Sequence, residues 1–567
     1  MLALTFPPPG GTGREAVSRG KKLFAMTLIT LIALIVVSQF THHADPTGTK
    51  TGATADYLAQ SGVKKVELSQ VGINALANTT GHLAIAINFS WLLITGFLVL
   101  FMQVGFAFLV TGLTRAKNAG HMMMMNLSSF VIALLAYYAV GFAFQFGGVS
   151  PIANLGGASP LTGIFGHGTA GLIGFHGFFL QSGNSYDVGV LAFFLFQVVF
   201  METAGYIIIG AIAERVSFAA FILAEIAMGA IIYPIYGMWM WGGGWLSQLG
   251  NGAFKLGNGA VDFAGSGVVH ATGGWAALAL AMILGPRIGK YNKDGSANAF
   301  PGHNLGYAVI GTLVLTFGWM GFNPGSTFGA TDLRISVVAV NTLLAASAGA
   351  VVAMAWTNAK WGKPDISMTC NGMLAGLVAV TAPCAFIAPW AAVAIGIIAG
   401  FVVVYAVEFL DKKAKIDDPC GAISVHGFCG LWGILAVGIF ADGTYPAKSV
   451  GWNGVLQPVK GIIPAILDGD KLFATHGAMS QLGAQVIDAG VGFLWAFGIT
   501  YLIFTIAKRF MAIRVPADVE IEGTDEGEFG QVCYPDFVLR AETHSGITTE
   551  LDAGRTPSGA TTGSSPA

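Results

Sequence analysis

Eleven long apolar stretches constrain this chain more than any other feature of its sequence. Beyond the N-terminal segment, each runs for about 20 mostly apolar residues, which is the length an α-helix needs to cross the hydrocarbon layer of a bilayer. They are centred near residues 98, 133, 200, 227, 274, 314, 346, 376, 398, 431 and 494. The sequence therefore predicts an all-α integral membrane protein with eleven transmembrane helices.

The composition agrees with a protein that lies in a lipid bilayer. The chain is 54% hydrophobic and 10% charged, whereas about 25% of an ordinary soluble domain is charged. A net charge of −2 argues against a nucleic-acid-binding surface. The five cysteines have no metal-type spacing, and an odd number does not make a disulfide framework. We expect no metal and no cofactor.

The loop charges predict the orientation in the membrane, because cytoplasmic loops carry an excess of Lys and Arg. Alternate loops and the tail hold Arg115, Lys117, Arg215, Arg287, Lys290, Lys293, Lys360, Lys363, Lys412, Lys413, Lys415, Lys508, Arg509 and Arg514. The other loops are longer and hold Lys255, Arg334, Lys448, Lys460 and Lys471. The first set is therefore expected in the cytoplasm, with the start of the core outside and the C-terminus inside.

The regions outside the core divide into three parts. Residues 1–40 carry four basic residues ahead of LFAMTLITLIALIVVSQF, which indicates a signal peptide or an N-terminal membrane anchor. Residues 41–84 indicate an extracytoplasmic linker or a short amphipathic segment, and residues 85–510 form the eleven-span core. Residues 511–567 are predicted to be a cytoplasmic tail, with an acidic part suited to docking and a disordered end.

Two stretches of the core share one spacing. VDFAGSGVVH ends at His270 and DPCGAISVH ends at His426, and in each an aspartate stands eight positions earlier, at Asp262 and Asp418. The two units begin the fifth and tenth spans, so the core divides into five, five and one. Five is odd, so the halves have opposite orientations, which is a recurrent design in transporters. The histidines are then expected to meet near the midplane, with each aspartate towards the boundary, where it can cap a helix or hold a loop. The alternative is two unrelated buried histidines bonded to backbone.

Several motifs together make the chain similar to the ammonium transporter family (the Amt/Mep/Rh superfamily), on the Amt side. In order, they are AIAERVSF, WGGG before VDFAGSGVVH, FGWMGFNPGS, DDPCGAISVHGFCG and RVPADVEIEG, while GTDEGEFG resembles the family's C-terminal signature loosely. The resemblance covers roughly residues 85–530. It implies a pseudo-twofold fold with two inverted five-helix repeats plus one helix, a homotrimer, and one pore through each subunit.

The resemblance also implies roles for matching residues. Phe200, Trp241 and Ser326 match an external ammonium recruitment site, and Phe322 stacked with Phe200 matches the gate beneath it. Asp262 matches a buried acid that supports the site without touching the ion. His270 and His426 match the paired pore histidines. By the same spacing argument, Asp418 is the second structural support.

Two departures from the family pattern bear on these expectations. The first span has Leu109 and Val110 where the family has Phe-Tyr, and Phe108 stands one place early. Glu202 follows Phe200 where small or apolar residues are usual. We expect these changes to affect the mouth of the pore and the affinity for ammonium. Glu202 and Glu225 are intramembrane acids and hence candidate functional groups, with paired structural roles as the alternative.

The sequence leaves three functional questions open. Passage of ammonia alone and passage coupled to a proton are both compatible with two facing imidazoles, and we favour the coupled form. An ammonium sensor with little flux is the alternative to a transporter. A membrane enzyme lacks support, since no nucleophile constellation appears. Expected partners are ammonium or ammonia, methylammonium as an open case, the lipid bilayer, and a PII-type signalling protein at the cytoplasmic face.

Overall fold

A computed structural model of the chain describes residues 70–147, 164–165, 171–180, 188–251, 254–446 and 458–535. The expected signal peptide or anchor at 1–40, residues 41–69 of the linker, and the predicted disordered end of the tail lie outside the described residues.

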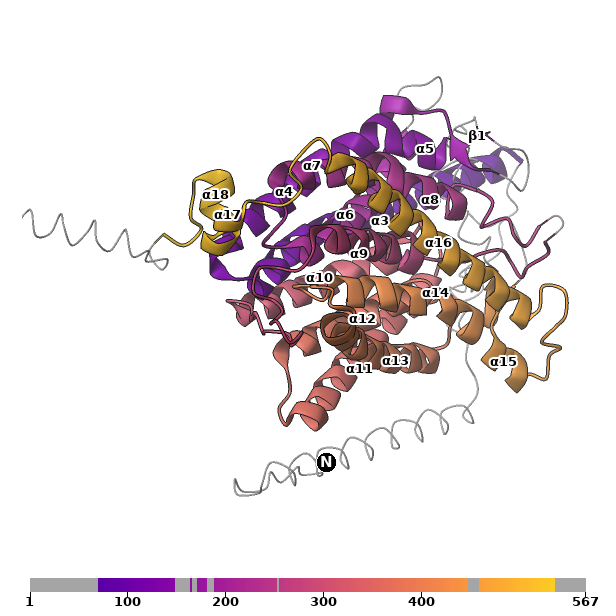
Figure 1. The fold of residues 1–567 in the computed structure, drawn as a ribbon. Helices are drawn as coiled ribbons and strands as arrows, with labels where there is room; N and C mark the ends of the chain where they lie inside the picture. Colours follow the sequence, from indigo (N-terminus) through magenta and orange to yellow (C-terminus); the bar gives the residue numbers. More distant parts are fainter. Residues whose placement is uncertain are drawn as a thin grey trace, which may run out of the picture.

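Each of the eleven predicted centres falls in a membrane-spanning helix, so the eleven-span prediction is confirmed (Figure 1). In chain order the spans are α3 (Gln70–Leu113), α4 to α5 (Ala119–Phe146, through the π-helical turn η2 at Tyr137–Gly141), α6 (Val188–Ile212), α7 to α8 (Phe218–Met240, through η6 at Met228–Ile232), η7 with α9 (Ser266–Leu284), α10 (Leu305–Gly325), α11 (Arg334–Trp361), α12 (Ile366–Thr381), α13 with η8 (Pro389–Ala414), η9 with α14 (Ile423–Phe440) and α16 (Ala478–Ala507). Ten of them are long and apolar enough to cross a bilayer, and α12 is a shorter apolar helix with mostly buried residues.

The first helices of the two halves, α3 and α10, pack along each other. Glycines allow this close approach, because a Cβ at Gly105 would lie 2.9 Å from the Leu315 nitrogen, and one at Gly311 would lie 2.5 Å from the Gly105 oxygen. Small residues at helix interfaces let backbones pack closely in membranes, where lipid offers no hydrophobic drive for association.

The start of α3 differs from the sequence expectation. Residues 70–84, predicted to belong to the linker, continue the first membrane-spanning helix to a length of 44 residues. No proline interrupts this segment, and most of its side chains before residue 84 are exposed. The sequence allowed a linker or a short amphipathic segment here, and the structure makes residues 70–84 a helix that extends beyond the packed bundle.

Short elements cover the two ends of the bundle. One end carries β1 (Ile164–Phe165) paired with β2 (Ile173–Gly174), the short helix η5 (Phe178–Leu180), β3 (Asp442–Pro446) paired with β4 (Pro458–Lys460), and α15 (Ile462–Leu467). The other end carries η1 (Ala116–Asn118), α17 (Ala517–Glu522) and α18 (Thr524–Phe529). Figure 1 shows α17 and α18 at the end of the molecule opposite β1 and α15.

The acidic part of the tail docks on the start of α4. The Asp525 carboxylate accepts hydrogen bonds from the backbone nitrogens of Gly120, at 2.9 Å, and His121, at 2.7 Å. These donors belong to the first turn of α4, whose amides have no partner within the helix. Lys117 Nζ donates to the Glu520 carbonyl at 2.8 Å. The tail therefore supplies the N-terminal cap that α4 lacks locally.

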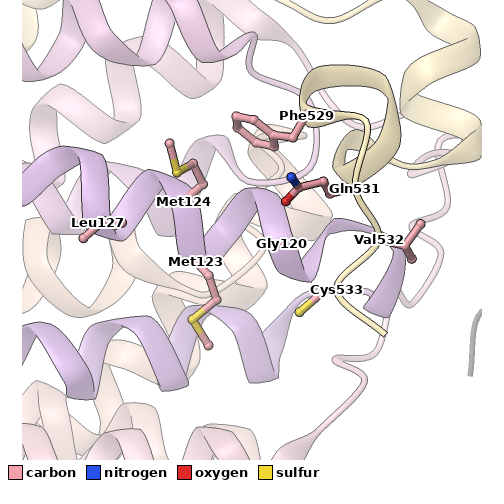
Figure 2. A pocket seen from close by; sticks show the side chains of 8 residues that line it. All are labelled: Gly120, Met123, Met124, Leu127, Phe529, Gln531, Val532 and Cys533. Atoms are coloured by element: carbon pink, nitrogen blue, oxygen red, sulfur yellow. The ribbon is translucent and has the colours of Figure 1, made fainter. Parts of the chain in front are cut away.

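A cavity of about 490 Å³ lies between α4 and the tail beyond α18. Figure 2 shows its lining, with methionines from α4 on one side and residues of the tail on the other. Met123 and Met124 line it, whereas Met122 and Met125 of the same run are buried in the core. The methionine run therefore serves both as core packing and as one wall of this cavity.

Buried ion pairs join the loops near the tail. Arg287 binds Asp417 through two hydrogen bonds, at 2.8 and 2.9 Å, and also pairs with Glu214 at 3.1 Å. Glu214 in turn pairs with Arg115 at 2.5 Å. Burial opposes ionisation of Asp417, but its bonds to Arg287 lower the pKa of this carboxyl to about 2. These pairs tie together the loops that follow the first, third and fifth spans and the loop that precedes the tenth.

Replacing Asp417 tests the ion pair with Arg287 through the pH dependence of the protein's stability. The carboxyl titrates near pH 2 when folded and near 3.9 when unfolded, so it stabilises the fold above about pH 4 and loses that effect as the pH falls towards 2. We expect Asp417→Asn to destabilise the protein by about 3 kcal/mol at neutral pH, with a gap in melting temperature from the unmodified protein that narrows below pH 4. Thermal unfolding in detergent measures this gap.

Asp411→Asn is the matched control, because Asp411 pairs with Lys290 but its side chain is 31% exposed. Its effect should stay below about 1 kcal/mol. Equal losses of stability for the two substitutions would contradict a stabilising role of ionised Asp417. A difference in melting temperature between Asp417→Asn and the unmodified protein that widens in acid would contradict it as well.

Candidate functional site

The structure brings His270 and His426 together in the middle of the bundle. Their Nδ1 atoms lie 3.2 Å apart and their ring centroids 5.2 Å apart. The two residues are 0% and 5% exposed. His270 comes from η7 and His426 from η9, the π-helical turns that begin the fifth and tenth spans. A hydrogen bond between the two rings requires that one nitrogen donates and the other accepts.

The Asp262 carboxylate caps the turn that carries His270. Its Oδ1 accepts hydrogen bonds from the backbone nitrogens of Gly265 and Ser266, and its Oδ2 accepts from Gly267 and Val268, all between 2.8 and 3.0 Å. A negative charge at a helix N-terminus satisfies the free amides and is favoured by the helix dipole. The cap thereby fixes the turn from which the His270 ring projects.

Asp418 does the same for the turn that carries His426. It accepts hydrogen bonds from the backbone nitrogens of Ala422 at 2.9 Å, Ile423 at 2.8 Å and Ser424 at 3.4 Å. The shared spacing of eight residues thus has a local physical cause. The chain must first turn so that the carboxylate meets the backbone amides of the helix start, and the histidine then follows within the turn that these amides begin. Each aspartate acts on its histidine through the backbone.

Trp241 is held against the same capped turn. Its indole nitrogen donates a hydrogen bond to the Asp262 carbonyl at 2.7 Å. Its ring lies edge-on to Phe200, with centroids 6.2 Å apart. Gly265 makes room for it, since its φ is 114° and a Cβ there would lie 3.2 Å from the Trp241 ring. One residue, Asp262, therefore positions both the Trp241 indole and the first histidine.

Aromatic rings fill the space between Trp241 and the histidines. Phe200 and Phe322 stack at 4.0 Å between centroids, and Phe322 stacks on His270 at 5.4 Å. Trp319 covers His270 as well, at 5.0 Å. Phe200 and Phe322 are 1% and 0% exposed, so their rings close the route between the indole and the imidazoles.

Ser326 ends α10 one turn beyond Phe322. Its hydroxyl donates to the Phe322 carbonyl at 2.9 Å. A hydroxyl has one proton and two lone pairs, so the oxygen can still accept a hydrogen bond from a guest. The side chain is buried at 3% exposure, which gives such a bond a largely dry setting.

A cavity of about 20 Å³ continues the route beside His426, which is room for one water-sized molecule. It is lined by Phe106, Leu109, Val110, Tyr206, Ile207, Gly210, Asn371, Leu374, Cys420, Ala422, Val425 and His426. The sequence reasoning missed Phe106 and Tyr206, which stack at 5.4 Å. Their aromatic character in an apolar span gave no signal that separates a lining residue from a packed one.

The structure places Leu109 and Val110 deeper along the route than Trp241, and their effect on pore entry and affinity stays a prediction. Both line the cavity beside His426, on the far side of the aromatic gate from Trp241. Phe108 packs edge-on against Tyr307 at 5.1 Å and does not replace them. Leu109 and Val110 lie near the C-terminal end of α3, and only this end of the helix contacts the cavity. The sequence pattern alone does not show which part of α3 faces the cavity.

In the described residues, eleven apolar helices surround a buried file of aromatic rings and two bonded imidazoles, an arrangement that defines a multi-pass membrane protein with a transport path. The chain belongs to the Ammonium Transporter Family, whose model matches residues 90–534. It is 47% identical over 471 residues to "Ammonium transporter Amt2" of Archaeoglobus fulgidus, covering 83% of this chain and 92% of that relative. It is 35% identical over 476 residues to "Ammonium transporter Amt1" of Haloferax mediterranei, covering 82% of each.

Solved structures show the same fold. The chain is similar to a "Sensor Amt Protein", with a TM-score of 0.67 and 36% identity, over 79% of this chain and 99% of that one. It is also similar to Candida albicans Mep2, with a TM-score of 0.63 and 27% identity, over 79% of this chain and 90% of that one.

The two caps predict an order of stability effects. Asp262→Ala leaves four buried amides without partners, and Asp418→Ala leaves three, one of them in a long bond. We expect losses of about 4 and about 2 kcal/mol, respectively. Thermal unfolding in detergent measures both. A larger loss for Asp418→Ala would refute the account of the caps.

Proposed function

We propose that the chain moves ammonium across a membrane by stripping one proton and passing ammonia through the path described above. The observation that carries the proposal is the 3.2 Å contact between the imidazoles of His270 and His426, placed below a stacked aromatic gate and above a water-sized cavity. The names of the relatives as ammonium transporters support it.

The recruitment of the cation rests on Trp241, Phe200 and Ser326. Aromatic faces attract a cation by about 2 kcal/mol once it is desolvated. That attraction does not separate ammonium from potassium, which is close in size. The Ser326 oxygen adds direction, because ammonium donates hydrogen bonds and potassium has no proton to donate.

Deprotonation is proposed because the path below the gate is apolar. Moving an ion out of water costs several kcal/mol even after relaxation, whereas ammonia carries no charge. Buried imidazoles favour their neutral form, since desolvation disfavours the charged one. Two neutral rings joined by one hydrogen bond can present edges to ammonia and also pass a proton. We propose that the proton crosses with ammonia and makes transport electrogenic, with plain ammonia conduction as the alternative.

Flux in liposomes tests the function itself. We expect the purified protein to speed the alkalinisation or acidification of the lumen after an ammonium gradient is applied, as followed by stopped flow with an internal pH dye. The similarity to a "Sensor Amt Protein" motivates the second candidate, a sensor with little flux. Saturable ammonium binding without accelerated flux would favour the sensor and reject transport.

Replacing either imidazole tests the proton step. We expect His270→Leu or His426→Leu to lower the ammonium-evoked current by about tenfold or more, because one member of the bonded pair is gone. Currents with ammonium and with potassium, recorded on supported proteoliposome membranes, measure the loss and the selectivity together. An unchanged, ammonium-selective current would exclude a required proton relay.

The finer expectations about setting and partners remain proposals. We propose a plasma (inner) membrane location with Trp241 facing outside and the tail in the cytoplasm, which the loop charges support. A homotrimer, acceptance of methylammonium and binding of a PII-type signalling protein at the docked tail rest on the family resemblance.

A further inference from the structure

Two glutamates inside the bundle take no part in the ammonia path. Glu202 on α6 and Glu225 on α7 are 1% and 0% exposed, and both lie within membrane-spanning helices. Two residues along an α-helix turn the side chain by about 200°, so Glu202 points away from the gate residue Phe200. Ionisable groups at this depth are costly and mark functional sites by default.

Four helices build the site around these carboxyls. Gln103 on α3 donates to Glu202 Oε2 at 3.3 Å, and Ser129 on α4 donates to Glu225 Oε2 at 2.7 Å. The carboxyl of Glu225 reaches α6 because residue 205 is a glycine, and any Cβ there would collide with Glu225 Oε2. The fold therefore makes specific room for the second acid beside the first.

Three polar atoms in this site have no hydrogen-bond partner in the structure. Glu202 Oε1, Glu225 Oε1 and the Tyr206 hydroxyl are buried without a hydrogen bond. The two glutamates interact electrostatically with each other, and Tyr206 interacts with both. Within the described residues, no ion pair involves either glutamate, and the groups bonded to them, an amide and a hydroxyl, carry no charge. Two adjacent negative charges in such surroundings are unfavourable, and one bound proton neutralises one of them.

Tyr206 connects this site to the ammonia path. It lies one turn beyond Glu202 on α6, and it also lines the cavity beside His426. We propose that Glu202 and Glu225 form a second proton-binding site, a carboxyl pair that exchanges a proton with that cavity through the Tyr206 hydroxyl. The inference rests on the proposed function and extends its proton step.

The exchange balances in protons and involves no oxidation. A protonated water in the cavity, charged through the imidazole pair, gives a proton to the Tyr206 oxygen. The original O–H bond of Tyr206 then breaks as its proton bonds to a glutamate carboxylate. The donor is left as water, and the tyrosine ends with its hydroxyl restored.

The test compares charge with ammonia in proteoliposomes that contain the full chain. Ammonium-evoked current on supported membranes gives the charge, and the total ammonium that accumulates in filtered proteoliposomes gives the ammonia flux. Glu202→Gln and Glu225→Gln should each lower the charge moved per ammonia by about tenfold and leave the ammonia flux largely intact. Tyr206→Phe, which alters a residue that lines the path, should lower the charge moved per ammonia by a similar factor. Tyr233→Phe is the control, since it removes another buried hydroxyl, packed against Tyr137, and should not change the ratio.

A spectroscopic readout keeps the inference testable if a glutamine variant fails to fold. The unmodified protein should show the infrared carbonyl band of a buried protonated carboxyl, shifted in Tyr206→Phe, which removes one oxygen only. A ratio of charge to ammonia that stays unchanged in all three variants would show a structural role and overturn the inference.

Two further results would lead to other conclusions about the glutamate site or about the proposed function. A current that disappears when sodium and potassium are replaced by choline would assign the site to a metal cation and also overturn it. Ammonia flux and current that are both absent from the unmodified protein would instead reject the proposed function.

Discussion

The carboxylate caps on the two π-helical turns are the interaction on which the rest of this structure depends. In a bilayer a free backbone amide has no water to bond, so the start of a buried helix must find acceptors within the protein. Asp262 and Asp418 supply them, with four and three amide bonds. Because each cap fixes its turn, the two imidazoles meet without a direct contact to either acid. The Asp262 carbonyl also holds Trp241, so one loop sets both ends of the aromatic file.

The aromatic file explains how a route can be closed to water and still admit a small neutral molecule. Phe200, Phe322 and His270 stack in sequence, so apolar ring faces separate the indole from the imidazoles. In the proposed function, ammonia passes during a brief displacement of these rings. A hydrated cation needs a lasting opening and a set of replacement ligands that these faces do not offer.

The sequence predicted the spans and the paired histidines because both leave local signals. Apolar length identified the eleven helices, and the repeated aspartate-to-histidine spacing identified the two turns. The features that it missed depend on contacts between distant segments. The position of Leu109 and Val110 beside His426 follows from the packing of α3 in the bundle. The pairing of Gly205 with Glu225 joins two helices whose faces the sequence does not orient. The helical start of α3 extends past the apolar region that defined its prediction.

The docked tail has a consequence for the order in which the chain can mature. The amides at the start of α4 belong to the second span, yet their acceptor, Asp525, is made about 400 residues later. While the ribosome is still producing the second repeat, Asp525 has not yet been made and these amides have no carboxylate to bond. The first repeat therefore completes its packing only after the tail is made. A product truncated before Asp525 lacks the cap of α4 even when all eleven spans are present.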